Sequence, residues 1–207
     1  MEKGFVEKDP NTKTYSLGLF LLFLSRRMLD HLDLRSVVSP FLDRLALETQ
    51  STAFLGLING DQVFVVAKKD GSNNNRVSAA VGNRFHITTG AHGKAILAFM
   101  SKEERTRILS GAELNFYGFN KPLDKKRLEQ ELKEIRQQKF AKDDGDLTPG
   151  INGISSPVFS STEGMIGCVL IMGTFPEKES EGFGFIVKDT AEQISYKLGA
   201  DINLAFH

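Results

Sequence analysis

The sequence predicts an α+β domain built on an antiparallel sheet. Two strand pairs and the helical segments among them carry this prediction. The first pair, 52–58 and 62–67, flanks Asn59-Gly60-Asp61, which is a strong hairpin signal. The second pair consists of apolar runs at 154–159 and 165–172. Hairpins with interspersed helices are typical of an antiparallel α+β fold and not of a parallel nucleotide-binding sheet.

The N-terminal segment predicts a short β-ribbon followed by an apolar helix. Phe5-Val6 and Tyr15 lie on either side of a polar turn at 8–13. Ser16 is a plausible N-cap for a helix running to about Asp30, with apolar residues on every side. Such a helix must be buried all round, either by another subunit or inside the core, and the run alone favours neither.

The other elements follow from periodicity and capping signals. We expect a further strand at 76–81 and a loop at 143–150. The predicted helices are 34–49, 94–100, 102–109 with Ser101 as N-cap, 124–138 and 183–198.

Composition excludes several classes of protein. The chain has 26 acidic and 26 basic residues, so no global charge attracts it to nucleic acid or to an anionic membrane. Its single cysteine, Cys168, excludes a disulfide framework or a cysteine cluster for metal within one chain. The longest apolar run, 17–24, is far shorter than the roughly 20 residues of a membrane span. Because a secretory signal is also lacking, we expect a cytoplasmic protein.

The sequence does not predict an enzyme. A glycine-rich phosphate loop, a zinc-protease helix and a nucleophile elbow are all missing from it. Cys168 lies within a predicted strand, where a thiol is usually buried and inert. His86 and His92 could meet an acidic residue in space to bind a metal, but the histidines lack the i, i+4 spacing of a metal helix. No cofactor is expected.

Two segments are candidates for ligand binding. In TTGAHGKAIL, residues 88–97, glycines flank a small residue and a histidine where a helix opens. Free backbone N–H groups there suit a carboxylate or phosphate, although a tight turn would explain the glycines equally. The acidic run 143–146 reads either as a solvated turn or as a ligand-facing loop, and it lacks the ligand spacing of a calcium loop.

Four segments in order resemble the IclR family of transcriptional regulators: EKGFVEKDPNTKTYSLG, TTGAHGKAILAF, LEQELKEIRQQKFAKDDGD and GINGISSPVFSSTEGMIGCVLIMG. The resemblance implies a winged helix-turn-helix followed by an effector-binding domain of GAF/PAS-like topology, a curved antiparallel sheet with helices on its faces. It implies a wing remnant at 1–15, a linker and dimerisation helix at 16–30 and the effector domain at 31–207.

The resemblance also implies the partners. The helix-turn-helix is expected before residue 1, so this chain itself would offer DNA only the wing residues Lys8 and Lys13. Operator DNA would be bound through that missing N-terminal domain of a homodimer or homotetramer. A stand-alone sensor without a DNA-binding head remains an alternative. So does an enzyme on the same fold, such as a methionine-sulfoxide reductase, which would need several cysteines.

The family's pocket positions match specific residues here. They are Gly90, Ala91, His92 and Gly93 at the turn, Asp146 with Asp144 close by, Gly153 and Ile154, and Leu170 and Met172 on the last strand. Relatives that bind small keto acids often carry serines on that last strand. The apolar Leu170 and Met172 therefore favour a larger or less polar effector, namely an aromatic or branched carboxylate.

Overall fold

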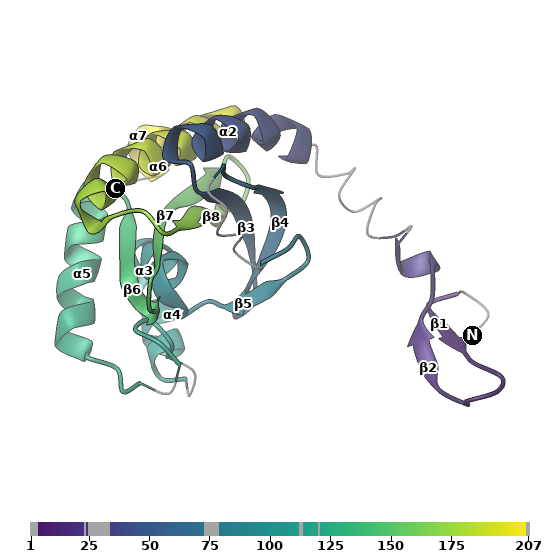
Figure 1. The fold of residues 1–207 in the computed structure, drawn as a ribbon. Coiled ribbons are helices and arrows are strands. Elements are labelled where there is room, and N and C mark those ends of the chain that lie inside the picture. The colour runs from purple at the N-terminus through teal and green to yellow at the C-terminus, as the bar shows by residue number, and fades with distance from the viewer. Residues whose placement is uncertain are drawn as a thin grey trace. The chain divides into compact units, whose positions relative to one another are not determined.

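The computed structural model of the chain describes residues 4–22, 24, 34–72, 79–111, 114–119 and 121–205 (Figure 1). The chain divides into two compact units, with the boundary after Val37. Within the described ranges, no helix combines the length and the apolar character that a membrane span requires.

The N-terminal unit contains the predicted ribbon. Strands β1 (Val6–Lys8) and β2 (Tyr15–Leu17) pair antiparallel. The Asp9 carboxylate accepts the N–H groups of Asn11 at 2.7 Å and Thr12 at 3.1 Å, which closes the turn. Lys8 and Lys13 are exposed on this ribbon, with Lys8 Nζ 5.3 Å from the centre of the Tyr15 ring.

The helix predicted from Ser16 begins later than expected. Ser16 lies in β2 opposite Glu7, and the first helical residue is Phe20. The reason is that the ribbon continues, since Gly18 N–H donates to the Phe5 carbonyl at 2.9 Å. The predicted continuation over 25–30 lies outside the described residues.

The larger unit is built on a six-stranded sheet in the order β5-β4-β3-β8-β7-β6, in which every neighbouring pair is antiparallel. The predicted hairpins β3–β4 and β7–β8 join through β3 and β8 at its centre. The strands are β3 (Thr52–Asn59), β4 (Gln62–Lys69), β5 (Arg84–His86), β6 (Ala141–Thr148), β7 (Ile151–Ser160) and β8 (Gly164–Gly173). The predicted antiparallel α+β fold is therefore confirmed.

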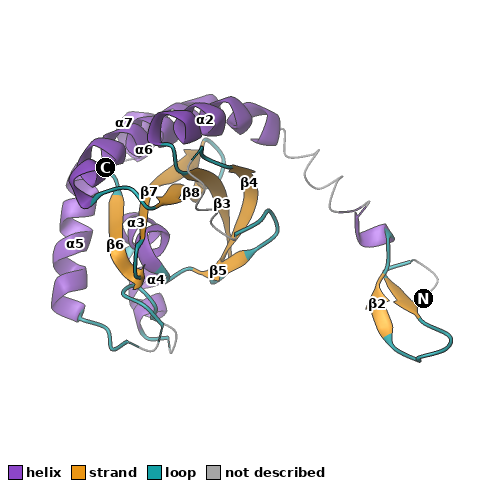
Figure 2. Cartoon of the chain, viewed as in Figure 1, coloured by secondary structure: helices purple, strands orange, loops and turns teal. Residues whose placement is uncertain are grey.

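Helices cover both faces of this curved sheet (Figures 1 and 2). Helix α6 lies beside α2 on the outer side, where Arg44 Nη2 donates to Gln193 Oε1 at 2.9 Å. Helices α3 and α4 lie on the inner, concave side, and α5 packs against α3. The helices are α2 (Leu34–Thr49), α3 (Gly90–Phe99), α4 (Lys102–Leu109), α5 (Lys125–Gln138), α6 (Glu177–Lys197) and α7 (Ile202–Ala205).

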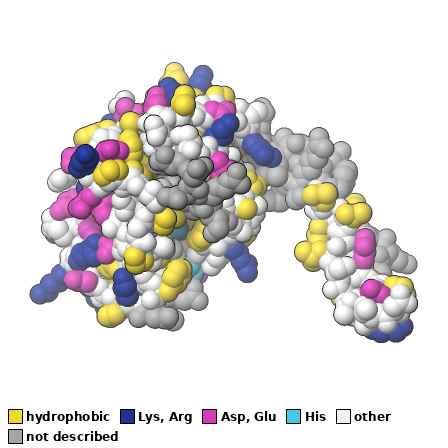
Figure 3. Space-filling view, in the orientation of Figure 1, with side chains coloured by type: hydrophobic (Ala, Val, Ile, Leu, Met, Phe, Trp, Pro, Cys, Tyr) yellow, Lys and Arg dark blue, Asp and Glu magenta, His cyan; other side chains and the backbone are white. Residues whose placement is uncertain are grey.

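The core explains why α3 and α5 stay together. The apolar stripe of α5, Leu128, Leu132 and Ile135, is buried in one cluster with Ile96 and Leu97 of α3. Burial of each such side chain contributes about 1.5–3 kcal/mol relative to exposure. Lys94 and Asp143 are buried charged residues. On the visible face of the larger unit, acidic and basic side chains are interspersed (Figure 3).

Capping confirms two of the predicted helix starts. The Ser101 side chain and Glu104 form a reciprocal capping box at α4, with Ser101 Oγ accepting from Glu104 N at 3.2 Å. At α5 the Asp124 carboxylate accepts from Arg127 N at 3.0 Å.

Besides the helix expected from Ser16, four element predictions differ from the structure. The strand expected at 76–81 is wrong over 79–81, which is not extended in the sheet, and its remainder lies outside the described residues. The edge strand is instead β5, three residues long. The loop expected at 143–150 is mostly strand β6, interrupted by a pairing irregularity between Asp144 and Thr148. Helices α3 and α6 begin earlier than predicted, at Gly90 and Glu177.

Candidate functional site

Helix α3 begins at glycines for structural reasons. Gly90 has a φ of 48°, which side-chain-bearing residues rarely adopt. A Cβ on Gly93 would lie 2.7 Å from the carbonyl oxygen of Ile87, so the first turn packs directly on the preceding chain. The glycine-rich segment 90–93, expected as a turn before the helix, therefore forms the first turn of α3 itself.

This first turn carries unpaired backbone donors. The first N–H groups of a helix have no partner inside it. Gly90 N–H donates to the Asn115 carbonyl at 3.3 Å, and Thr89 supplies no side-chain cap. Within the described ranges, the N–H groups of Ala91 and His92 meet no acceptor. The helix dipole adds partial positive charge at this end, so the turn favours an anionic or carbonyl oxygen.

A cavity lies between this turn and the sheet, and we call it the α3 cavity. It measures about 20 Å³, which is room for about one water molecule. Its walls are Gly90, Ala91 and His92 of α3, Asp143, Leu147 and Thr148 of β6, Ile151 and Gly153 of β7, and Leu170 and Met172 of β8.

A second cavity of about 20 Å³ adjoins the first, because both are lined by His92, Leu170 and Met172. We call this second cavity the apolar cavity, because its remaining lining residues are almost entirely apolar. These residues are Phe54, Gly56, Val63, Val65, Ala79, Phe85 and Cys168. Together the two cavities offer a polar end at α3 and an apolar end above the centre of the sheet.

His92 stands between the two cavities as a neutral side chain. Its side chain is buried, its ring lies 5.9 Å from that of Phe85, and burial lowers its pKa to about 4. Nε2 lies 3.3 Å from the His86 carbonyl oxygen, which can only accept. Nε2 therefore carries the proton, which leaves Nδ1 as an acceptor.

Asp143 is the only carboxylate among the described residues that line the α3 cavity. It is 5% exposed, and its Oδ1 accepts the N–H groups of Asp146 at 2.8 Å and Leu147 at 3.2 Å. Its Oδ2 lies 3.0 Å from where a Cβ of Gly90 would stand, so it faces the first turn of α3. Burial raises the pKa of Asp143, and the two N–H donors and Lys94 oppose that rise.

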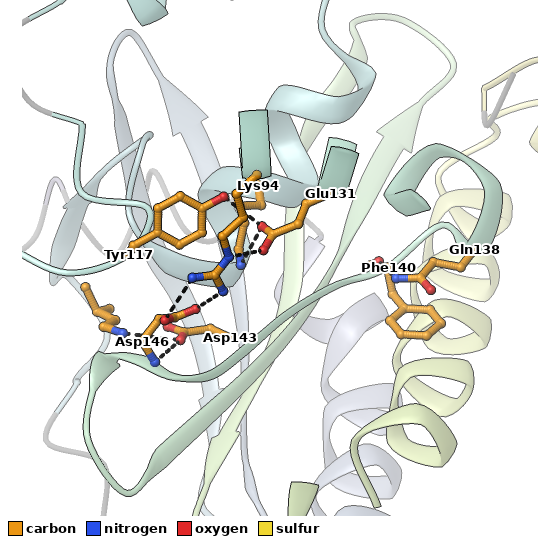
Figure 4. A network of polar contacts seen from close by, with 9 residues as sticks. Lys94, Tyr117, Glu131, Gln138, Phe140, Asp143 and Asp146 are labelled. Atoms are coloured by element: carbon orange, nitrogen blue, oxygen red, sulfur yellow. Dashed lines mark hydrogen bonds and ion pairs between the residues drawn. The ribbon is translucent and has the colours of Figure 1, made fainter. Parts of the chain in front are cut away.

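A polar network behind the cavity ties α3 to α5 (Figure 4). Lys94, 2% exposed, pairs with Glu131 of α5 at 3.0 Å. Glu131 also accepts from the Tyr117 hydroxyl at 3.1 Å and from Arg127 Nε at 2.8 Å. Since Lys94 lies two residues after His92, the network fixes the first turns of α3.

The same network extends to β6. Both terminal nitrogens of Arg127 donate to the Asp146 carboxylate, and Lys121 Nζ donates to the Asp146 carbonyl at 2.9 Å. Asp146 in turn donates its N–H to Asp143. Contacts with α5 therefore fix the position of helix α3 relative to strand β6, and these two elements form the polar walls of the α3 cavity.

The structure brings together six of the ten residues that the sequence proposed as effector contacts. Those lining the α3 cavity are Gly90, Ala91, His92, Gly153, Leu170 and Met172. Gly93 lies behind the turn, against Ile87. Ile154 is fully buried next to Gly153, and neighbouring strand residues point to opposite faces.

The two acidic residues proposed from sequence lie elsewhere. Asp144 accepts a hydrogen bond from Ser180 Oγ of α6 at 2.9 Å, and α6 is on the outer face. Asp146 is paired with Arg127. Their neighbour Asp143, which belongs to the acidic run but was not among the ten proposed contacts, faces the cavity. In the structure, buried Ala141 and Asp143 alternate with the more exposed Lys142 and Asp144, as expected of a strand.

Other reactive groups are not arranged for chemistry. Cys168 is buried, which raises the pKa of its thiol to about 12, so no thiolate forms near neutral pH. His86 Nδ1 bonds to Thr88 Oγ1 at 2.7 Å. In the described part of the chain, no three His, Cys, Asp or Glu side chains are grouped to bind a metal ion.

Comparison with known proteins identifies the family. Residues 26–196 match the model for the C-terminal domain of the bacterial transcriptional regulator IclR. The chain belongs to the IclR family.

Individual relatives agree with that membership. The IclR-family chain is similar to the HTH-type transcriptional regulator KipR of Bacillus subtilis, with 29% identity over 96% of this chain and 80% of KipR. It is 25% identical to the HTH-type transcriptional repressor AllR of Escherichia coli over 94% of this chain and 73% of AllR. These relatives are transcriptional regulators and not enzymes.

Solved IclR structures share the fold. The crystal structure of IclR from Thermotoga maritima superimposes with a TM-score of 0.79 at 28% identity, covering 96% of this chain and 81% of that one. The curved antiparallel sheet predicted through the family resemblance is thereby confirmed.

Proposed function

We propose that this IclR-family chain is the ligand-sensing and dimerising part of a transcriptional regulator and that a small organic acid binds in the α3 cavity. The observation that carries the proposal is the convergence of two free N–H groups at the start of α3 with the buried polar side chains of His92 and Asp143. An oxygen of the acid is held by the N–H groups of Ala91 and His92.

The apolar walls support an aromatic or branched body for this acid. Leu170 and Met172 line both cavities, and Phe54 and Phe85 line the apolar cavity. A buried apolar body gains about 25 cal/mol for each Å² removed from water. The polar head and the apolar body thus occupy the two ends of one continuous site.

Effector binding requires the site to open, because two cavities of about 20 Å³ hold no organic acid. Opening moves α3 relative to β6, and the network through Lys94, Glu131 and Arg127 passes that movement to α5. The effector then shifts the population toward the open form. A coupling of about 1–3 kcal/mol suffices for a useful switch.

The proposed organisation follows the family resemblance. The ribbon that ends with β2 at Leu17 forms the wing of a winged helix-turn-helix, a linker helix that begins at Phe20 pairs between subunits, and residues 31–207 form the effector domain. Operator DNA is bound through the helix-turn-helix of a cytoplasmic homodimer or homotetramer, with Lys8 and Lys13 on the wing. The spacing of two DNA-reading heads is what the effector changes.

Thermal unfolding with a panel of aliphatic and aromatic acids tests this function. We expect at least one acid to raise Tm in proportion to the logarithm of its concentration, because it binds only the folded state. At a concentration of about 100 Kd the gain is about 2.7 kcal/mol. If no acid of the panel raises Tm at millimolar concentration, the proposed sensing of organic acids is contradicted.

A further inference from the structure

The α3 cavity contains an unused acceptor beside its donors. Asp143 Oδ1 is occupied by the N–H groups of Asp146 and Leu147. Oδ2 has no hydrogen-bond donor among the described residues and faces the first turn of α3. Asp143 is only 5% exposed, and no fully buried side-chain oxygen of the described residues lacks a partner, so Oδ2 keeps slight access to water. Losing that water without gaining a hydrogen-bond donor costs free energy. A ligand that leaves Oδ2 unpaired in the closed site would bear that cost.

The charges around the cavity do not favour a plain carboxylate. Among the described residues that line the cavity there is no lysine or arginine, and the nearby Lys94 is engaged by Glu131 at 3.0 Å. His92 is neutral and offers Nδ1 as a second acceptor. A bare carboxylate would meet the two N–H donors of α3 but would also place its charge beside the carboxylate of Asp143.

We propose that the effector carries a hydroxyl or amide N–H donor next to its acceptor oxygen, as a 2-hydroxy acid or an amide does, and that this donor bonds to Asp143 Oδ2. The inference rests on the proposed function, since it assigns a chemical class to the ligand of the same site. The N–H groups of Ala91 and His92 donate to the carbonyl or carboxylate oxygen of the effector, and Asp143 selects the donor beside that oxygen.

Matched pairs of probes test this class. Calorimetric titration compares lactate with propionate, mandelate with phenylacetate, and phenylacetamide with phenylacetate. In each pair the donor-bearing compound should bind about ten- to a hundredfold more tightly, which is the effect of one hydrogen bond to a charged group.

The variant Asp143→Asn should reverse this preference. Two backbone N–H groups hold Oδ1, so the asparagine must place its oxygen there and its NH₂ group where Oδ2 stood. The cavity then presents a donor instead of an acceptor. Phenylacetate should bind Asp143→Asn at least as tightly as mandelate does. Asp144→Asn is the matched control, because Asp144 contacts Ser180 on the outer face and should leave the wild-type preference unchanged.

The outcomes separate this inference from the proposed function. Equal binding within the wild-type pairs, or tighter binding of propionate and phenylacetate, would overturn the inference and leave the sensing of organic acids intact. If none of the five compounds binds the wild-type protein, both are contradicted. The affinities of the matched pairs for the wild-type protein test the inference even if Asp143→Asn does not fold.

Discussion

Replacing Gly167 with alanine should lower the free energy of unfolding by more than about 4 kcal/mol, a loss seen only for severe steric or buried-charge defects. A Cβ at Gly167 would lie 1.9 Å from the carbonyl oxygen of Gly56 and 2.9 Å from its carbon. Both atoms are backbone, so no side chain can move aside. The contact is between β8 and β3, the two central strands that join the hairpins, and relief requires them to separate.

Chemical denaturation followed by far-UV circular dichroism measures this loss. Gly182→Ala is the control: it lies in α6, with no atom within 4 Å of its Cβ position. An alanine there should stabilise the protein by up to about 1 kcal/mol through its higher helix propensity. A Gly167→Ala protein as stable as the wild type would show that β3 and β8 do not approach as closely as described.

Replacing Glu131 with leucine should cost about 3–5 kcal/mol, because it removes the carboxylate that is paired with the buried ammonium of Lys94. The Lys94 side chain is 2% exposed and its Nζ lies 3.0 Å from Glu131. The ring of Tyr117, 5.2 Å from Nζ, offers only a weak cation–π contact in place of the carboxylate.

Removing Lys94 instead of Glu131 should lower the free energy of unfolding by less. In Lys94→Met, Glu131 still accepts from Arg127 and Tyr117, so its charge remains paired. The double variant Lys94→Met/Glu131→Leu should recover most of the loss, since an apolar pair can replace a buried ion pair. Denaturation of all three variants gives the coupling free energy. A loss of less than about 1 kcal/mol in Glu131→Leu, typical of exposed pairs, would contradict the buried network.

Much of the fold follows from local signals in the sequence. Asn59-Gly60-Asp61 marks the β3–β4 turn, and Ser101 and Asp124 mark the starts of α4 and α5. These features depend on residues close together in the chain, so periodicity and capping rules find them. The GAF-like curvature, in contrast, was predicted through the family resemblance.

The misplaced elements depend on distant contacts. The run Asp143-Asp144-Gly145-Asp146 has the composition of a turn, yet it forms part of β6 because β7 supplies a partner strand and Arg127 neutralises Asp146. Strand β5 is only three residues long and is defined by its pairing with β4. Such tertiary effects override local propensity.

The candidate site likewise contains features set by local sequence and features set by distant contacts. The start of α3 was predicted from its glycines, because glycine favours the local backbone conformation that Gly90 adopts. Asp143 was missed because its role depends on which face of β6 points to α3, and that face could not be assigned once the segment was taken for a loop. Asp144 and Asp146 match the composition expected of the site, but their side chains contact Ser180 and Arg127 instead.

Titration of Gly153 variants tests most directly whether the α3 cavity is the effector site. A Cβ at Gly153 would make ordinary contacts, 3.7 Å from the Ala91 Cβ and 3.9 Å from the Asp143 Cβ, so it enters the cavity without a clash. We expect mandelate to bind the wild-type protein, to bind Gly153→Ala more weakly and not to bind Gly153→Val, while circular dichroism shows that both variants are folded. Binding of mandelate to Gly153→Val as tight as to the wild type would contradict the account.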